Sequence, residues 1–94
     1  MKFRLGQLLA TPGALRAIGE SGQAPWDFLS RHLRGDWGQV CPEDWRLNDQ
    51  ALRDGGRLLS AYQTLKGQKV WVLTEAADDT GHRAATTILV PDEY

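Results

Sequence analysis

The side chains with the greatest chemical potential lie within residues 31–45, which read R-H-L-R-G-D-W-G-Q-V-C-P-E-D-W. Cys41 precedes Pro42 at the expected start of a helix, where the helix dipole favours the nucleophilic thiolate. A base such as His32 or His82 would complete a cysteine hydrolase pair. No known nucleophile signature or glycine-rich oxyanion loop accompanies the cysteine. We therefore predict no catalytic residue and expect Cys41 to be a structural residue at a helix N-cap.

The same stretch contains potential metal ligands. His32 and Asp36 are four residues apart, Cys41 follows them, and His82 lies far along the chain. Zinc generally takes paired ligands such as Cys-x2-Cys or His-x3-His, and the chain contains neither pair. Gly35 also interrupts the helix between His32 and Asp36. We therefore predict no metal and no cofactor, with His32 bonded to a backbone carbonyl at the end of its helix.

A tight corner, Gly35-Asp36-Trp37-Gly38, follows His32. Glycines permit backbone angles that other residues avoid, and an aspartate can bond its own backbone to form a turn. Trp37 then either folds into the core, which is the usual use of tryptophan in a small domain, or stands on a rigid tip as an interface anchor. Both roles are open.

Helices flank the corner on both sides. Three segments begin with proline at a first-turn position, and each ends at glycine, as helix termini commonly do. The predicted helices start at Pro12, Pro25 and Pro42 and are ended by Gly22, Gly35 and Gly55.

From residue 57 onward the hydrophobic period changes from 3.6 to 2, which indicates strands at 57–65, 70–74 and 86–90. Residues 3–9 are compatible with a further short strand with Leu8 or Leu9 turned inward. The chain is therefore predicted to be a single α+β domain spanning 1–94. In it, two to three short N-terminal helices pack on one face of a three- to four-stranded antiparallel sheet that ends in a C-terminal meander.

The chain ends in T-T-I-L-V-P-D-E-Y. If the strand at 86–90 lies at the edge of the sheet, its unpaired backbone invites strand addition by a partner or by a second copy of the chain. Pro91 and the acidic residues after it limit such pairing. This strand is the expected contact of a homodimer.

Composition excludes several classes of function. Eleven basic and twelve acidic residues give a net charge of −1, whereas nucleic-acid-binding proteins usually carry a basic excess. A single cysteine cannot form an internal disulfide. No hydrophobic run approaches signal-peptide or membrane-spanning length. We expect a cytoplasmic protein that does not bind membranes, with nucleic acid an unlikely partner.

Several motifs together resemble a family of small uncharacterised bacterial proteins. They are A-T-P-G-A-L at 10–15, F-L-S-R-H at 28–32, G-D-W-G at 35–38, N-D-Q-A-L at 48–52 and W-V-L-T-E-A at 71–76. Members occur on plasmids, phages and integrated mobile elements and carry labels such as "plasmid-related protein". The resemblance implies a mobile-element setting. It implies no activity and no catalytic residues.

These observations favour a non-enzymatic protein-protein interaction module encoded by a mobile element. Its expected partner is a host protein complex, with a defence system such as restriction or CRISPR as the leading candidate. The alternatives are a small cysteine-dependent enzyme using Cys41 and His32, and a weak nucleic-acid-binding protein. The predicted partner-binding residues are Arg34, Asp36, Trp37, Glu43, Asp44 and Trp45.

Overall fold

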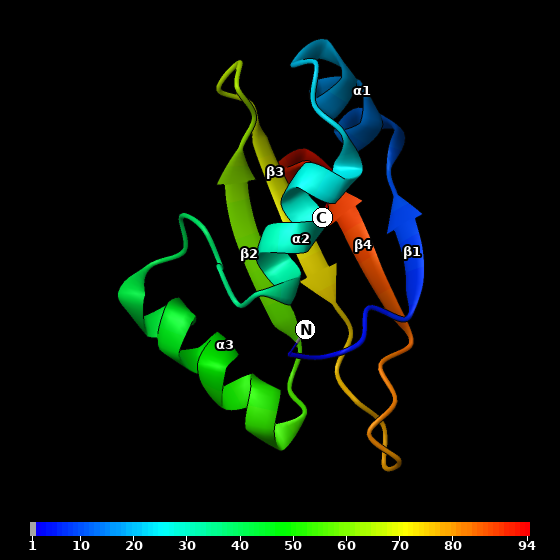
Figure 1. The fold of residues 1–94 in the computed structure, drawn as a ribbon, viewed down its shortest axis with the longest axis vertical. Coiled ribbons are helices and arrows are strands. Elements are labelled where there is room, and N and C mark those ends of the chain that lie inside the picture. The colour runs from blue at the N-terminus through cyan, green and yellow to red at the C-terminus, as the bar shows by residue number, and fades with distance from the viewer. Residues whose placement is uncertain (1) are drawn as a thin grey trace.

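A computed structural model describes residues 2–94 and contains four strands, three α-helices and a short 3-10 helix (Figure 1). In chain order the elements are β1 (Gln7–Ala10), α1 (Pro12–Glu20), α2 (Pro25–Leu33), α3 (Pro42–Asp54), β2 (Leu58–Gln63), β3 (Lys69–Thr74), β4 (Ala85–Leu89) and η1 (Pro91–Glu93). The three predicted helices and the three C-terminal strands are therefore confirmed, and the broad α+β class holds.

The sheet has the strand order β1-β4-β3-β2 and is mixed. The meander β2-β3-β4 is antiparallel, as predicted, but β1 pairs with β4 in parallel. The prediction of a purely antiparallel sheet is therefore wrong. All three helices lie between β1 and the meander in the sequence. This long connection allows β1 to pair in parallel with β4, on the side of β4 that faces away from β3.

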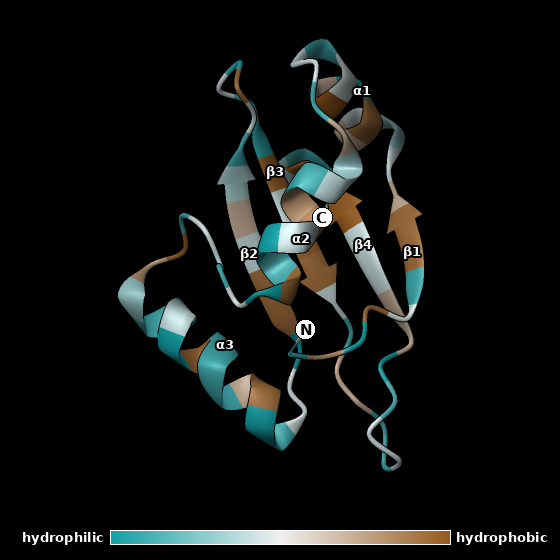
Figure 2. Cartoon of the chain, viewed as in Figure 1, coloured by the Kyte–Doolittle hydropathy of each residue, from teal (hydrophilic) through white to brown (hydrophobic). Residues whose placement is uncertain are grey.

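Helices α1 and α2 cover one face of the sheet (Figure 1). The main core lies between them and the strands and is built from small and medium apolar residues with two aromatic rings. Its buried members are Ala14, Ala17, Ile18, Phe28, Leu29, Tyr62, Val70, Val72 and Ile88. Figure 2 shows the corresponding contrast between a hydrophobic β3 and a mostly hydrophilic α3.

Helix α3 lies beside β2 (Figure 1). A second core cluster is formed by Trp37, Ala51 and Leu58, with Phe3, Val40 and Leu52 packed against it. Helix α3 is thus held at the side of the sheet by the corner and by the first residue of β2.

The two edges of the sheet differ. The N–H of Gln7 donates to the Ala84 carbonyl, and the N–H of Thr11 donates to the Ile88 carbonyl. The backbone N–H and C=O groups of the odd-numbered residues of β1 therefore point toward β4, and those of Leu8 point away from the sheet. Leu8 and Leu9 are 54% and 45% exposed, so the expectation that one of them turns inward is wrong. Strand β1 is therefore an open edge.

Strand β4 lies inside the sheet, between β1 and β3. Its backbone already pairs on both sides, which removes the premise of strand addition at 86–90. The predicted homodimer through the last strand is therefore wrong. The sequence could not show this, because the covering strand comes from the opposite end of the chain.

Candidate functional site

The corner after α2 is a helix C-terminus followed by an aspartate turn. Gly35 has a positive φ of 80° and donates its N–H to His32, while the N–H of Asp36 reaches the carbonyl of Arg31. This pair of bonds is the Schellman arrangement, which glycine favours. Asp36 Oδ1 then accepts the N–H of Gly38 at 3.1 Å. The predicted turn chemistry of Asp36 is confirmed.

The corner lies directly against the outer edge of β2. Gln39 N–H donates to the Ala61 carbonyl at 2.7 Å, and Ala61 N–H donates to the Trp37 carbonyl at 3.1 Å. Gly38 has φ 76°, and a Cβ atom at this position would overlap the Ala61 carbonyl oxygen. The corner therefore acts as a short extra strand that closes this edge of the sheet.

A side chain of α3 closes the next position of the same edge. Asn48 Nδ2 donates to the Leu59 carbonyl at 2.8 Å, and Leu59 N–H donates to Asn48 Oδ1 at 3.2 Å. One amide thus satisfies both backbone groups of one strand residue. Together with the corner, it protects β2 from pairing with another chain.

Trp37 is 0% exposed, so it belongs to the core. Its ring packs with Ala51 and Leu58, and its Nε1–H donates to Asp49 Oδ1 at 2.9 Å. The prediction of Trp37 as a partner-binding residue is therefore wrong for the folded chain. A buried indole needs a polar partner, and α3 provides one.

The other predicted contact residues separate into two groups. Arg34, Glu43, Asp44 and Trp45 are exposed. Asp36 is half-buried and forms an ion pair with Arg31 at 2.9 Å. Burial tends to raise the pKa of Asp36, but hydrogen bonds from Arg31 and Gly38 outweigh it and hold that pKa below its usual value. The carboxylate of Asp36 therefore stabilises the corner through its bonds to Arg31 and Gly38.

An apolar groove lies along the first half of α3. Its volume is about 440 Å³, and it is lined by Val40, Pro42, Trp45, Arg46 and Asp49. Trp45 remains 36% exposed there. Of the six predicted residues, Trp45 lines this groove, and the other five do not: Arg34, Asp36, Trp37, Glu43 and Asp44. The sequence contained a signal for the rest of the lining, since Val40 and Pro42 are apolar residues that flank Cys41.

The opposite side of α3 carries a second hollow. It is lined by Val40, Asp44, Leu47, Asn48, Arg57 and Leu59, and its volume is about 320 Å³. Leu47 is 48% exposed. Val40, which precedes α3, lines both hollows, and the two hollows flank the helix on opposite sides.

His32 lies at the centre of a buried polar chain. Its Nδ1 is 2.5 Å from Ser60 Oγ and its Nε2 is 2.9 Å from Thr74 Oγ1. Thr74 in turn bonds Thr86 at 2.7 Å, and Thr86 Oγ1 donates to the Leu5 carbonyl at 2.7 Å. Each hydroxyl has one proton to donate, so Thr74 donates to Thr86 and accepts from His32. This assigns the proton of the neutral imidazole to Nε2 and leaves Nδ1 to accept from Ser60.

The environment of His32 favours the neutral ring. Burial lowers its pKa to about 4, and the charge of Arg83 contributes in the same direction. Phe3 and Trp37 pack edge-on against the ring at centroid distances of 5.2 and 5.4 Å. The prediction of a bond from His32 to a backbone carbonyl is wrong, because three hydroxyl-bearing strand residues provide the polar chain instead.

The structure does not assemble the proposed cysteine pair. Cys41 is exposed at the N-cap of α3. His32 is 0% exposed, and both of its ring nitrogens are engaged by Ser60 and Thr74. Cys41 and His32 therefore do not form a nucleophile and base.

Potential metal ligands are also dispersed. Within residues 2–94, no group of three or more His, Cys, Asp or Glu side chains is close enough to hold a metal ion. In the same range, no helix has the length and apolar character needed to span a membrane.

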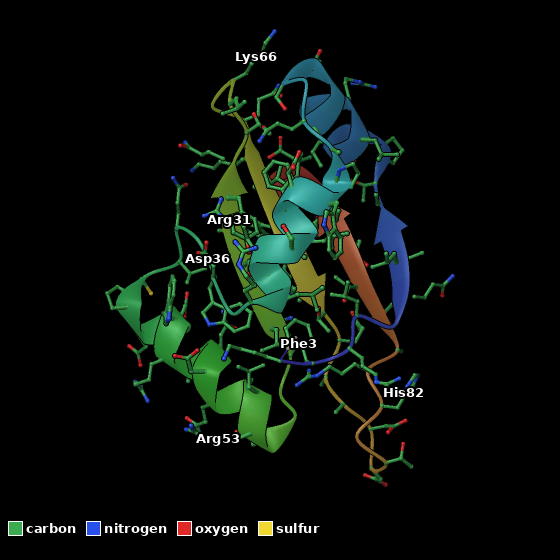
Figure 3. All side chains as sticks on the ribbon, in the orientation of Figure 1. Phe3, Arg31, Asp36, Arg53, Lys66 and His82 are labelled. Carbon is green, nitrogen blue, oxygen red and sulfur yellow. The ribbon has the colours of Figure 1, made fainter. Side chains whose placement is uncertain are left out.

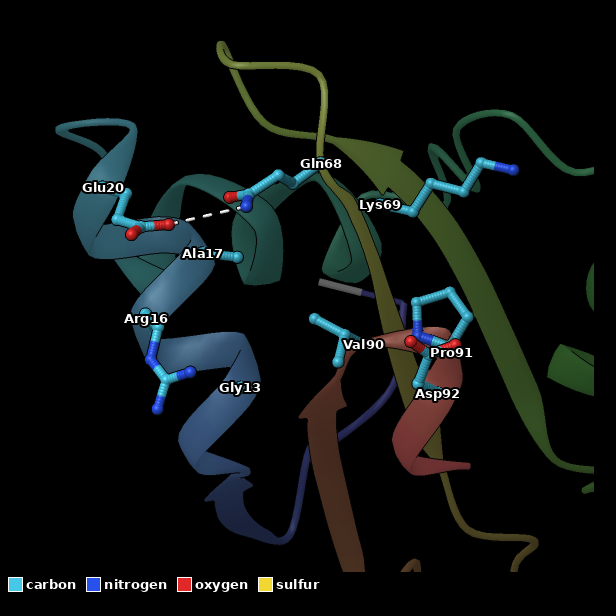
Figure 4. Close-up of a pocket in the computed structure, with 9 residues that line it drawn as sticks. All are labelled: Gly13, Arg16, Ala17, Glu20, Gln68, Lys69, Val90, Pro91 and Asp92. Atoms are coloured by element: carbon cyan, nitrogen blue, oxygen red, sulfur yellow. Dashed lines mark hydrogen bonds between the residues drawn. The ribbon is translucent and has the colours of Figure 1, made fainter.

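A further groove of about 560 Å³ separates α1 from η1 and the start of β3 (Figure 4). Its walls carry charges of both signs, with Arg16 and Lys69 against Glu20 and Asp92. Glu20 accepts a bond from Gln68 at 3.5 Å across it. The mixed charges do not converge on a common point, so this groove presents no evident chemistry.

No family model matches the chain, and comparison with curated proteins and with solved structures likewise finds no match.

Proposed function

We propose that the chain is a non-enzymatic protein-protein interaction module that binds its partner through the exposed face of α3. The observation that carries this proposal is Trp45, a partly exposed tryptophan beside an apolar groove. Tryptophan is the residue type most enriched at the energetic centres of interfaces, where it fills or flanks a pocket.

The chemistry of the rim defines the kind of partner. Glu43 and Asp44 occupy the first turn of α3, and Asp49 borders the groove. Arg46 is paired with Glu43 at 3.4 Å, which leaves Asp49 as the acidic residue of the groove lining without an ion-pair partner among residues 2–94. Asp44 borders the hollow on the opposite side of α3. The partner is therefore a protein surface that offers an apolar side chain to the groove and basic side chains to its rim.

The resemblance to plasmid and phage proteins extends the proposal to its setting. In this reading the partner is a component of a host defence complex, of the restriction or CRISPR type, and the module inhibits it. The localisation that fits such a partner is the cytoplasm.

Affinity purification from bacterial cells that carry such complexes, followed by mass spectrometry, tests the proposal. A captured partner is then titrated against Trp45→Ala and Trp26→Ala. Trp26 is the matched control, because it is a tryptophan on α2 that is 57% exposed. Trp45→Ala is expected to weaken binding by at least about tenfold, while Trp26→Ala leaves it unchanged. Undiminished binding by Trp45→Ala, with an unaltered circular-dichroism spectrum, would contradict the proposal.

A further inference from the structure

A second cleft lies at the opposite end of α3 from the groove beside Trp45. Three segments that are distant in sequence enclose it: the N-terminal stretch before β1, the C-terminal end of α3 and the loop between β3 and β4. Figure 3 shows Phe3, Arg53 and His82 on these three segments at this end of the molecule. The cleft has a volume of about 390 Å³, and its lining is Lys2, Phe3, Arg4, Leu52, Arg53, Gly55, Ala77, Gly81, His82 and Arg83.

The lining is basic and contains no carboxylate. Four residues of the lining are cationic, Lys2, Arg4, Arg53 and Arg83, and His82 adds an imidazole; the Cδ and Cε atoms of Lys2 lie beside Gly35 in the corner. This concentration occurs in a chain whose net charge is −1. A cleft with walls of one charge sign focuses the electric field and concentrates ions of the opposite sign.

The four cations have no carboxylate within ion-pair distance. The two ion pairs found within residues 2–94 are Arg31 with Asp36 and Arg46 with Glu43, both outside this cleft. The nearest acidic influences are indirect. Asp54 acts on Arg83 through space, and Asp78 accepts the backbone N–H of His82 at 3.0 Å. The positive charge of the cleft is therefore left for a ligand to neutralise.

Arg83 gives the cleft a fixed floor. Its side chain is 7% exposed, and its Nη1 donates to the backbone carbonyls of Gly56 at 2.7 Å and Glu75 at 3.0 Å. Its Nη2 donates to the Ala51 carbonyl in the last turn of α3 at 3.0 Å. Neutral carbonyls orient the guanidinium without cancelling its charge. These bonds use three of the five N–H donors of Arg83, so the guanidinium contributes a fixed positive charge and at most two remaining N–H donors to the cleft.

We propose that this cleft binds a small anion that carries two or more phosphate groups. Arginine matches phosphate geometry through paired N–H donors. The cations come from three segments, which suits a ligand with more than one anionic group. The volume is that of a small-molecule site. This site is separate from the α3 surface that binds the protein partner, so either can fail without the other.

Titration with inorganic pyrophosphate, monitored through the amide chemical shifts of the protein, tests the site. Shifts are expected in residues 2–4, 53–56 and 77–83. The double variant Arg4→Gln/Arg53→Gln removes two exposed cations without touching the buried bonds of Arg83, and it should weaken pyrophosphate binding by about tenfold or more. Lys66→Gln is the matched control, because it removes one cation from the hairpin turn at the other end of the molecule (Figure 3). It should leave the affinity unchanged.

Further ligands separate the sources of phosphate. A nucleoside diphosphate that binds more tightly than pyrophosphate identifies a nucleotide, and equal binding identifies the phosphate groups alone as the determinant. Both results support the site. Three results would overturn it: no shifts with millimolar pyrophosphate, unchanged binding by the double variant, or displacement of pyrophosphate by a single-stranded oligonucleotide at far lower concentration.

Discussion

Protonation of His32 should destabilise the fold between about pH 8 and pH 5. Burial, aided by the charge of Arg83, lowers the pKa of His32 from 6.5 to about 4. In this window the imidazole of His32 becomes protonated in the unfolded chain and stays neutral in the folded chain. The free energy of unfolding therefore falls as the pH falls. With these two pKa values, the expected loss of unfolding free energy from about pH 8 to pH 5 is about 2 kcal/mol, and it approaches about 3 kcal/mol near pH 4.

Urea unfolding at a series of pH values measures this loss. The comparison ends near pH 5, because carboxyl groups such as Asp36, whose pKa lies below its usual value, contribute at lower pH. His32→Gln should flatten the profile, since an amide does not titrate. The ring resonances of His32 in the unaltered protein provide a test that does not depend on a variant folding. Titration of those resonances near pH 6.5, or a flat stability profile in the unaltered protein, would refute the reasoning.

Three further predictions concern the closed edge of β2. Gly38→Ala should destabilise the fold by at least about 2 kcal/mol in chemical denaturation, because it adds a clash with Ala61 to backbone strain. Gly22→Ala is the control: its φ is 74° but no neighbour lies within 4 Å, so it should cost about 1 kcal/mol. Equal losses in the two variants would contradict the clash. In hydrogen exchange, the outward amide of Leu8 should exchange much faster than the amide of Ala61, which donates to the corner; similar protection would argue against an open β1 edge. Asn48→Ala should reduce the unfolding free energy by about 1–3 kcal/mol, because it leaves two backbone groups of β2 unpaired, and a neutral effect would indicate that water replaces both bonds.

Local rules predicted most elements of this fold because their signals lie within a few residues. Proline begins α1, α2 and α3, and Gly35 and Gly55 follow the last two helices with positive φ. The alternation in β2 was also informative, since Leu58, Ser60 and Tyr62 form its buried face. These features depend on backbone geometry near each residue, which the sequence expresses directly.

Pairings between distant segments were not predictable in this way. The parallel ladder joins Gln7 to Ala85, and no local pattern shows that β1 will cover β4. The polar chain around His32 could not be predicted either. Thr74 and Thr86 have the sequence pattern of ordinary strand residues, and only the fold brings Thr74 to His32 and Thr86 to Thr74. The role of Arg83 was likewise not predictable, because its carbonyl acceptors lie at the C-terminal end of α3 and after β3, two places that are distant in sequence.

The two tryptophans around the corner should separate stability from binding. Trp37 ties the corner to α3 through its bond to Asp49, whereas Trp45 faces the groove from the exposed side of the same helix. Trp37→Phe keeps an aromatic ring in the core and removes the N–H donor, so it should lower the unfolding free energy by about 1–3 kcal/mol. The folded fraction should still bind the protein partner with nearly unchanged affinity.

Trp45→Ala should instead lose partner binding in its folded fraction, whatever stability it also loses, because the exposed part of Trp45 borders the groove. Measurement of both quantities for both variants tests this separation. Parallel losses of stability and affinity in the two variants would mean that α3 and the corner act as one unit. The bond from Trp37 to Asp49 would then position the binding face as well as support the fold.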